Sequence, residues 1–116
     1  MYDHIGLQVR DLEAAQRFYR AALEPLGHVA DGSGIGFGPA GAPALWLHAN
    51  ARAKGGAHVA LRAADRRAVE RFHAQGLKAG GRDNGAPGLR SDYSPTYYAA
   101  FLIDPDGNNV EAVCLK

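Results

Sequence analysis

Apolar and polar residues alternate at the start of the chain and again near its middle. The segment HIGLQV, from residue 4, places a branched apolar side chain at every second position. The segment HVALR, from residue 58, repeats that arrangement. A period of two predicts strands with one face in a core and the other face turned away from it.

Each of these strands is followed by a segment with the apolar spacing of a helix. The first has its apolar residues at Leu12, Ala15, Tyr19, Ala22 and Leu26, and the second at Val69, Phe72 and Gly76. Asp11 and Asp65 stand where an N-cap accepts hydrogen bonds from free helix amides. Gly27 and the pair Gly80-Gly81 are typical of helix ends.

Short runs of aromatic and branched residues after the helices predict the remaining strands. They lie near residues 28–30, 35–37 and 44–48 after the first helix, and near 78–81, 97–103 and 109–115 after the second. The sequence NGAPGLRSDYSPT, residues 84–96, predicts a long loop. Asp104-Pro105-Asp106-Gly107 fits a type I turn, so the last two strands form a hairpin.

The chain repeats itself at a shift of 54 residues (58 − 4), which aligns His4 with His58. Eight of the 24 aligned positions from His4 to Gly27 carry identical residues, without a gap. The chain is therefore expected to hold two copies of a βαβββ module, in the α+β class. We expect one domain over 1–116, with modules at about 1–49 and 57–116 and a linker at about 50–56.

Composition and charge exclude several classes of protein. The formal net charge is +1 and the thirteen Lys and Arg residues are scattered, which argues against nucleic acid or an anionic membrane as partner. No signal peptide or membrane span is recognisable. Cys114 is the single cysteine, so no internal disulfide forms and a cytoplasmic location is expected. We expect Cys114 to be a small buried strand residue.

The repeat brings out three residues with metal-binding side chains. His4 and His58 occupy equivalent strand positions, on the face opposite the large apolar residues. Glu111 faces the same side if Val110 and Ala112 face the helix. Two imidazoles and a carboxylate suit a divalent metal with open coordination positions. A single strand histidine or glutamate is more often just hydrogen-bonded or solvated, so the prediction rests on the combination.

Three segments resemble the vicinal oxygen chelate superfamily, which includes glyoxalase I, extradiol dioxygenases, fosfomycin-resistance enzymes and bleomycin-resistance proteins. They are DHIGLQVRDLEAAQRFY from Asp3, GAHVALRA from Gly56 and YYAAFLIDPDGNNVEAV from Tyr97, and together they span both modules. The resemblance implies paired βαβββ modules whose curled mixed sheets surround a shared cavity with a metal at its floor.

The resemblance maps the family's metal ligands onto His4, His58 and Glu111, and makes Glu111 a catalytic residue. A fourth ligand of glyoxalase I, a glutamate, falls on Trp46 when ALWLH is set against NVEAV. This departure puts a lactoylglutathione lyase activity in doubt. Trp46 is interpreted as a cavity wall that stacks against a substrate. His48 either approaches the site or lies near solvent at the strand end.

Other substrate contacts are expected from the second module. Arg62, on the face of His58, either binds an anionic group or is solvated. One of Tyr97 and Tyr98 faces the cavity side, and the irregular loop before them leaves open which one.

The function expected from the resemblance is that of a lyase, isomerase or dioxygenase dependent on one divalent metal. Its substrate would be a small molecule that chelates the metal through adjacent oxygens. Iron, manganese, nickel, zinc and cobalt all suit the donor set. The alternatives are a metal-free binding protein of the bleomycin-resistance type and a thiol transferase of the fosfomycin-resistance type. The sequence leaves open whether the protein forms a homodimer and whether the two chains exchange modules.

Overall fold

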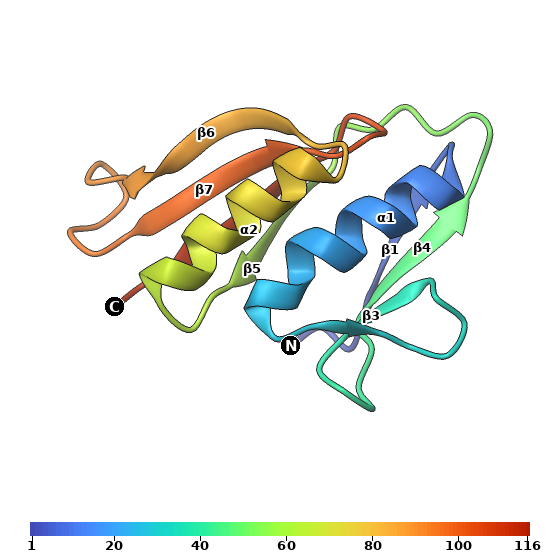
Figure 1. Cartoon of the computed structure of the whole chain (residues 1–116), viewed down its shortest axis with the longest axis horizontal. Helices are drawn as coiled ribbons and strands as arrows, with labels where there is room; N and C mark the ends of the chain where they lie inside the picture. Colours follow the sequence, from blue (N-terminus) through green and yellow to red (C-terminus); the bar gives the residue numbers. More distant parts are fainter.

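A computed structural model describes all 116 residues of the chain. The first half runs β1 (Ile5–Val9), α1 (Leu12–Leu23), a short 3₁₀ helix η1 (Glu24–Leu26), β2 (Val29–Ala30), β3 (Gly36–Gly38) and β4 (Leu45–Ala49). The second half runs β5 (His58–Arg62), α2 (Arg66–Lys78), β6 (Arg82–Leu89), β7 (Tyr98–Ile103) and β8 (Asn109–Cys114). The expected α+β architecture of two repeated modules is confirmed (Figure 1).

Each half forms a four-stranded mixed sheet. The strand orders are β1-β4-β3-β2 and β5-β8-β7-β6. The first strand of each module pairs in parallel with the last, and the other neighbours are antiparallel. The equivalent strands β1 and β5 are therefore both at a sheet edge, and the two sheets do not close into one.

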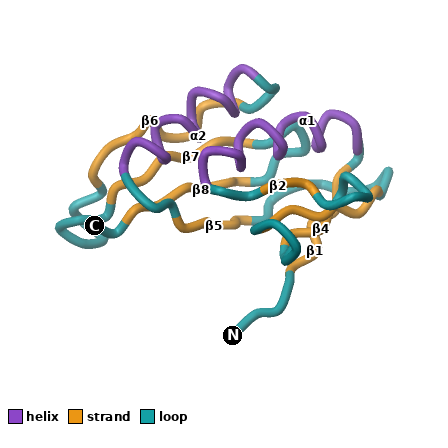
Figure 2. Tube along the Cα trace, turned by 60° about the horizontal axis from the view of Figure 1, so that its bottom comes forward, coloured by secondary structure: helices purple, strands orange, loops and turns teal.

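The two helices lie side by side on the same side of both sheets (Figure 2). Leu7 and Val9 of β1 and Val110 and Ala112 of β8 are buried beneath them, in one core shared by the two modules. The other side of the sheets, which we call the open face, carries the alternate residues. The period-two reading of the strands is thus confirmed.

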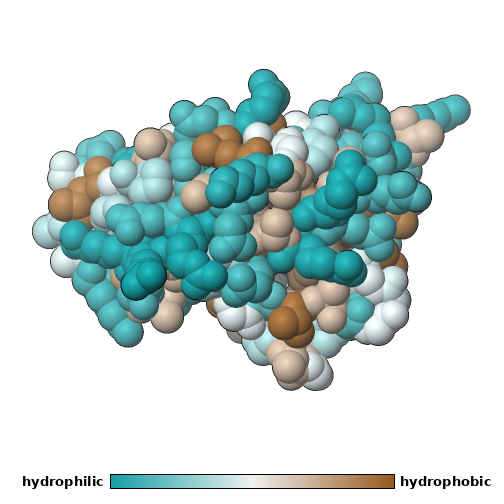
Figure 3. Space-filling model, in the orientation of Figure 1, coloured by the Kyte–Doolittle hydropathy of each residue, from teal (hydrophilic) through white to brown (hydrophobic).

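The helix caps form as the sequence predicts. Ala14 N donates to Asp11 Oδ1 at 3.1 Å, and Ala68 N donates to Asp65 Oδ1 at 2.8 Å. Gly27, with φ of 85°, ends the 3₁₀ extension of α1. The outer faces of both helices are largely hydrophilic (Figure 3). Neither helix has the length and apolar character needed to cross a membrane.

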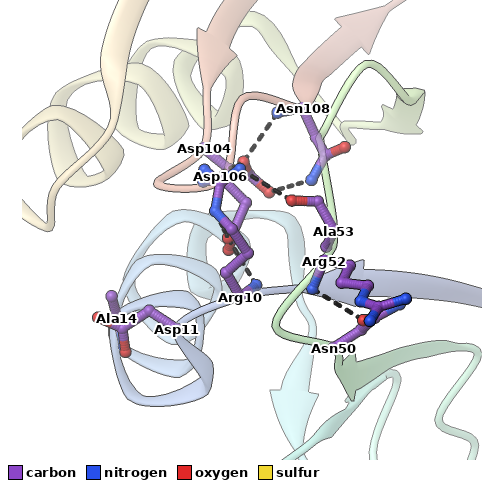
Figure 4. Close-up of polar contacts among 9 residues, drawn as sticks. All are labelled: Arg10, Asp11, Ala14, Asn50, Arg52, Ala53, Asp104, Asp106 and Asn108. Carbon is purple, nitrogen blue, oxygen red and sulfur yellow. Dashed lines mark hydrogen bonds and ion pairs between the residues drawn. The ribbon is translucent and has the colours of Figure 1, made fainter.

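The turn between β7 and β8 joins the two modules through buried polar groups (Figure 4). Gly107 N donates to Asp104 O at 3.1 Å, as expected for a β-turn. Asp106 Oδ1 accepts from the backbone of Arg10 at 2.6 Å, and Arg10 Nη1 donates to Ala53 O at 2.8 Å. The motif DPDGN thus ties the second module to the end of β1 and to the linker.

One strand was placed wrongly by the sequence. Residues 78–81 form no strand, since Lys78 ends α2, whereas β6 occupies Arg82–Leu89 and extends into the loop expected at 84–96. Gly85, Pro87 and Gly88 are typical of loops, but β6 pairs with β7 through two register shifts that accommodate them. Cys114 is buried in β8, as expected.

Candidate functional site

Glu111 is the centre of a cluster of side chains on the open face of β8. Glu111 is 1% exposed, although its side chain points away from the helices. His58 Nε2 lies 2.8 Å from Glu111 Oε1, and the Tyr97 hydroxyl donates to Glu111 Oε2. A buried carboxylate without partners would be costly, so this pair of contacts fixes its position.

The sheet register explains why these side chains meet. Ala60 of β5 is paired with Glu111, and Phe101 of β7 is paired with it on the other side. Because alternate residues of a strand share a face, His58 lies beside Ala60 on the open face and reaches Glu111. The predicted convergence of His58 and Glu111 is present in the structure.

The hydrogen bond to Glu111 raises the pKa of Tyr97 to about 12, with burial and the negative charge of Glu111 acting in the same direction. The Tyr97 hydroxyl therefore keeps its proton at neutral pH. Its hydrogen bond fixes Glu111 Oε2, and Glu111 Oε1 is directed toward His58.

Tyr97, and not Tyr98, is the member of the pair on the open face. Tyr98 donates to Glu70 of α2 at 2.7 Å, and Arg66 Cζ lies 4.9 Å from its ring centre. Tyr98 therefore lies against the helix, on the face opposite Glu111. The irregular loop before β7 hid the parity that decides between the two.

His4 is separate from this cluster. Its side chain is 59% exposed, and its Nδ1 lies 2.5 Å from Asp3 Oδ1. It lines a different hollow, of about 220 Å³, together with Leu23, His28 and Leu61. In no place do three or more His, Cys, Asp or Glu side chains lie close enough together to hold a metal ion. One chain therefore does not assemble the predicted trio.

The site is also open. None of the three hollows of the surface is lined by His58 or Glu111. His58 is itself 53% exposed. The shared cavity expected from the sequence is thus not enclosed by a single chain.

The open face of the first sheet carries Trp46 and His48. Trp46 is paired with Gly6 just as Glu111 is paired with Ala60, so Trp46 stands at the position equivalent to Glu111. A Cβ on Gly36 would lie 2.7 Å from the Trp46 ring, and one on Gly6 would lie 2.9 Å from the His48 ring. These two glycines leave room for both rings to lie close over the sheet.

Arg90 and Phe101 extend the Glu111 cluster toward β6. The Phe101 ring centre is 6.3 Å from that of His58, and Arg90 Cζ is 5.3 Å from the Phe101 ring centre. Phe101 was missed as a site residue, and Arg90 was expected only in a loop covering the mouth of the cavity, because β6 and its register with β7 were not predicted. Arg62 is exposed at the end of β5 and forms no ion pair.

Comparisons with known proteins agree with this architecture. A family model described as a glyoxalase-like domain matches residues 4–113. A solved glyoxalase/bleomycin resistance protein from Albidiferax ferrireducens T118 is 30% identical, with a TM-score of 0.80 and 98% of each chain covered. No match is found among curated proteins.

Two more distant structures share the fold. A glyoxalase/dioxygenase from Nostoc punctiforme is 21% identical, with a TM-score of 0.73, and the alignment covers 100% of this chain and 91% of that one. A lactoylglutathione lyase from Agrobacterium tumefaciens is 21% identical, with a TM-score of 0.66, and 96% and 90% are covered.

Proposed function

Because this chain belongs to the glyoxalase-like domain family, within the vicinal oxygen chelate superfamily, we propose that it is a divalent-metal-dependent enzyme acting on a small molecule with adjacent oxygens. The observation that carries the proposal is the contact of His58 with the buried Glu111 on the open face. Carboxylates with so little exposure are rare outside paired or functional settings. The reaction would be that of a lyase, isomerase or dioxygenase.

The proposed metal site needs a second copy of the chain. His58 and Glu111 supply two donors, and no third side chain of the same chain joins them. His4 is exposed, and both edge strands β1 and β5 lack a partner on one side. In a twofold dimer, His4 of one copy would meet His58 and Glu111 of the other, and the same contact would form twice.

In such a dimer the second copy would also cover the site. An enzyme excludes water from its reacting groups, whereas His58 is 53% exposed in one chain. The Tyr97 hydroxyl orients Glu111 and keeps its proton near the carboxylate. A divalent ion in a complete site would act as a Lewis acid toward the substrate's oxygens.

Metal analysis tests the proposal. Untagged protein, reconstituted separately with iron, manganese, nickel, zinc and cobalt, should hold about one ion per chain for at least one of them. His4→Ala, His58→Ala and Glu111→Ala should each lose it. His73→Ala is the matched control, because His73 contacts Asp83 on another surface and should keep full metal content. Absence of metal from the wild-type protein under all conditions would refute the proposal.

A second candidate is a metal-free binding protein of the bleomycin-resistance type. It is favoured by one observation, namely that His58 and Tyr97 already satisfy Glu111 without any ion. In that case the site would bind its ligand equally well in the presence of a chelator. The comparison of ligand binding with and without chelator separates the two candidates.

A further inference from the structure

Arg90 lies beside the Glu111 cluster as a fixed cation. Across the open face of the second sheet the order is His58, Glu111, Phe101 and Arg90. This follows from the pairing of Phe101 with Glu111 and from the stacking of Arg90 over the Phe101 ring at 5.3 Å. The flat ring of Phe101 therefore separates the positive group from the proposed reaction centre.

The guanidinium is held in place from behind. Arg90 Nη1 donates to Gly88 O and Nη2 donates to Ala86 O, each at 2.8 Å. A Cβ on Gly85 would lie 2.9 Å from Phe101 and 3.1 Å from Arg90 Nη2, and one on Gly88 would lie 3.3 Å from Arg90 Nη1. The two glycines of β6 thus leave the space in which the guanidinium stacks, and its orientation is set in advance.

The charge of Arg90 is not neutralised within the chain. No carboxylate lies within ion-pair distance of it, and its two hydrogen bonds go to uncharged carbonyls. A guanidinium has five N–H groups, so it still has donors for a further partner. If Arg90 only stabilised the end of β6, neither a permanent charge nor a stacked ring beside the site would be needed.

We infer that Arg90 recognises an oxyanion of the ligand, so that the substrate class is small carboxylates. An apolar part beside the Phe101 ring would join the carboxylate to the end that reaches His58 and Glu111. This inference rests on the proposed function only in taking the Glu111 cluster as the reaction centre. Planar guanidinium groups bind carboxylates through paired hydrogen bonds and stack on aromatic rings, and both features suit Arg90.

Ligand binding to the metal-free protein tests the inference. Benzoate and its uncharged isostere benzamide are titrated into ¹⁵N-labelled protein at neutral pH, and amide shifts and the Arg90 Nε–H signal are followed by NMR. Benzoate should give saturable shifts at His58, Gly88, Arg90 and Phe101. It should bind about tenfold more tightly than benzamide, because benzamide cannot form charge-assisted hydrogen bonds.

Single substitutions test whether Arg90 causes the preference for benzoate over benzamide. Arg90→Gln should abolish the preference for benzoate, and Arg90→Lys should retain part of it. Arg67→Gln is the matched control, since it removes an exposed positive charge from α2, on the other side of the sheet, and it should leave the preference unchanged. The comparison of benzoate with benzamide in wild-type protein needs no variant to fold.

Three results would overturn the inference: equal affinities for benzoate and benzamide, shifts confined to the hollow around Leu23 and His28, or an unchanged preference in Arg90→Gln. The test is independent of the metal. Failure to bind metal would refute the proposed enzyme while leaving the preference for benzoate intact. Loss of that preference would leave the metal site standing.

Discussion

At the scale of single residues, the interpretation of the second sheet depends on Glu111. Its position in the middle of β8 would be ordinary for a solvent-facing strand, but the residue is 1% exposed. His58 and Tyr97 each contact one of its oxygens. A buried acidic group that contacts two polar side chains on the open face is the feature that makes this strand a candidate for function.

Removing the charge of Glu111 should change the titration of Tyr97. In Glu111→Gln, the pKa of Tyr97 should fall from about 12 toward 10.0, because the hydrogen bond to a carboxylate is its largest cause. ¹³C NMR of labelled tyrosine rings measures it directly. Tyr98, whose pKa is raised by Glu70, should be unaffected and is the internal control. An unchanged pKa of Tyr97 would show that Glu111 does not stabilise the protonated Tyr97 hydroxyl.

The same interaction has a consequence for stability at high pH. The folded-state pKa of Tyr97 lies above its unfolded value of 10.0, so the stabilisation is complete below pH 10. It is lost as the pH rises from about 10 to about 12. Tyr97→Phe should therefore flatten the fall in unfolding free energy across this window, measured by urea denaturation. An equal fall in both proteins would contradict the assignment.

Sequence reasoning found part of this site. Parity along β5 and β8 predicts that His58 and Glu111 share a face, because both strands are regular and strongly patterned. Parity did not choose between Tyr97 and Tyr98, since the loop before them is irregular. Arg90 stacks on Phe101 only because β6 bulges twice, which no local pattern indicates.

At the level of elements, the linker before β5 and the turn after β7 fit together backbone to backbone. Gly55 has φ of 73°, and a Cβ on it would lie 2.3 Å from Asp106 O. Gly56 N donates to Gly107 O at 3.1 Å. This close approach holds the start of β5, and with it His58, against the hairpin that carries Glu111.

Gly55→Ala should therefore be far more harmful than an alanine at another glycine with the same backbone conformation. We expect a loss of about 2–4 kcal/mol, from backbone strain plus overlap with backbone atoms that cannot move aside. Gly41 has φ of 78° and open space around it, so Gly41→Ala isolates the strain, at about 1–2 kcal/mol. Equal losses in thermal or urea unfolding would show that the linker and turn are not in close contact.

The buried turn makes a second prediction about elements. The Tyr19 hydroxyl of α1 donates to Asp104 Oδ2 at 2.6 Å, and both groups are buried. Tyr19→Phe should lower the unfolding free energy by about 1–3 kcal/mol, because a buried charge-assisted hydrogen bond is lost. Tyr98→Phe removes the exposed hydrogen bond to Glu70 and should cost under about 1 kcal/mol. The reverse order in urea unfolding would contradict this account.

Element prediction was most accurate where the chain repeats. The caps at Asp11 and Asp65 and the helix ends follow from residues at fixed positions. β6 was missed because Gly85, Pro87 and Gly88 predict a loop, whereas pairing with β7 makes them part of a strand. The motif DPDGN was read as a turn, but its buried contacts with Arg10 and Tyr19 depend on a module about a hundred residues away in the sequence.

At the scale of the whole molecule, the internal repeat predicted the candidate metal-binding residues. It did not predict that His4 lies apart from His58 and Glu111. His4 and His58 begin equivalent strands, but those strands lie in different sheets. Two sets of contacts fix the relative position of the modules. α1 packs beside α2, and Arg10 contacts Asp106 and Ala53. In that arrangement His4 lies near Leu61 in its own hollow and does not join Glu111. Under the proposed function, a complete metal site would therefore need donors from a second copy.

Exchange of chains between two defective variants tests this claim most directly. His4→Ala and Glu111→Ala are mixed, unfolded, refolded together and reconstituted with the metal that the wild-type protein binds. Half of the randomly formed dimers are hybrids, and one of the two sites in each hybrid is intact. About a quarter of the wild-type metal content is therefore expected, although neither variant alone should hold any. A mixture of His58→Ala with Glu111→Ala should recover nothing, since both changes affect the same half-site. No recovery in the first mixture, with metal present in the wild-type protein, would contradict a site shared between two chains.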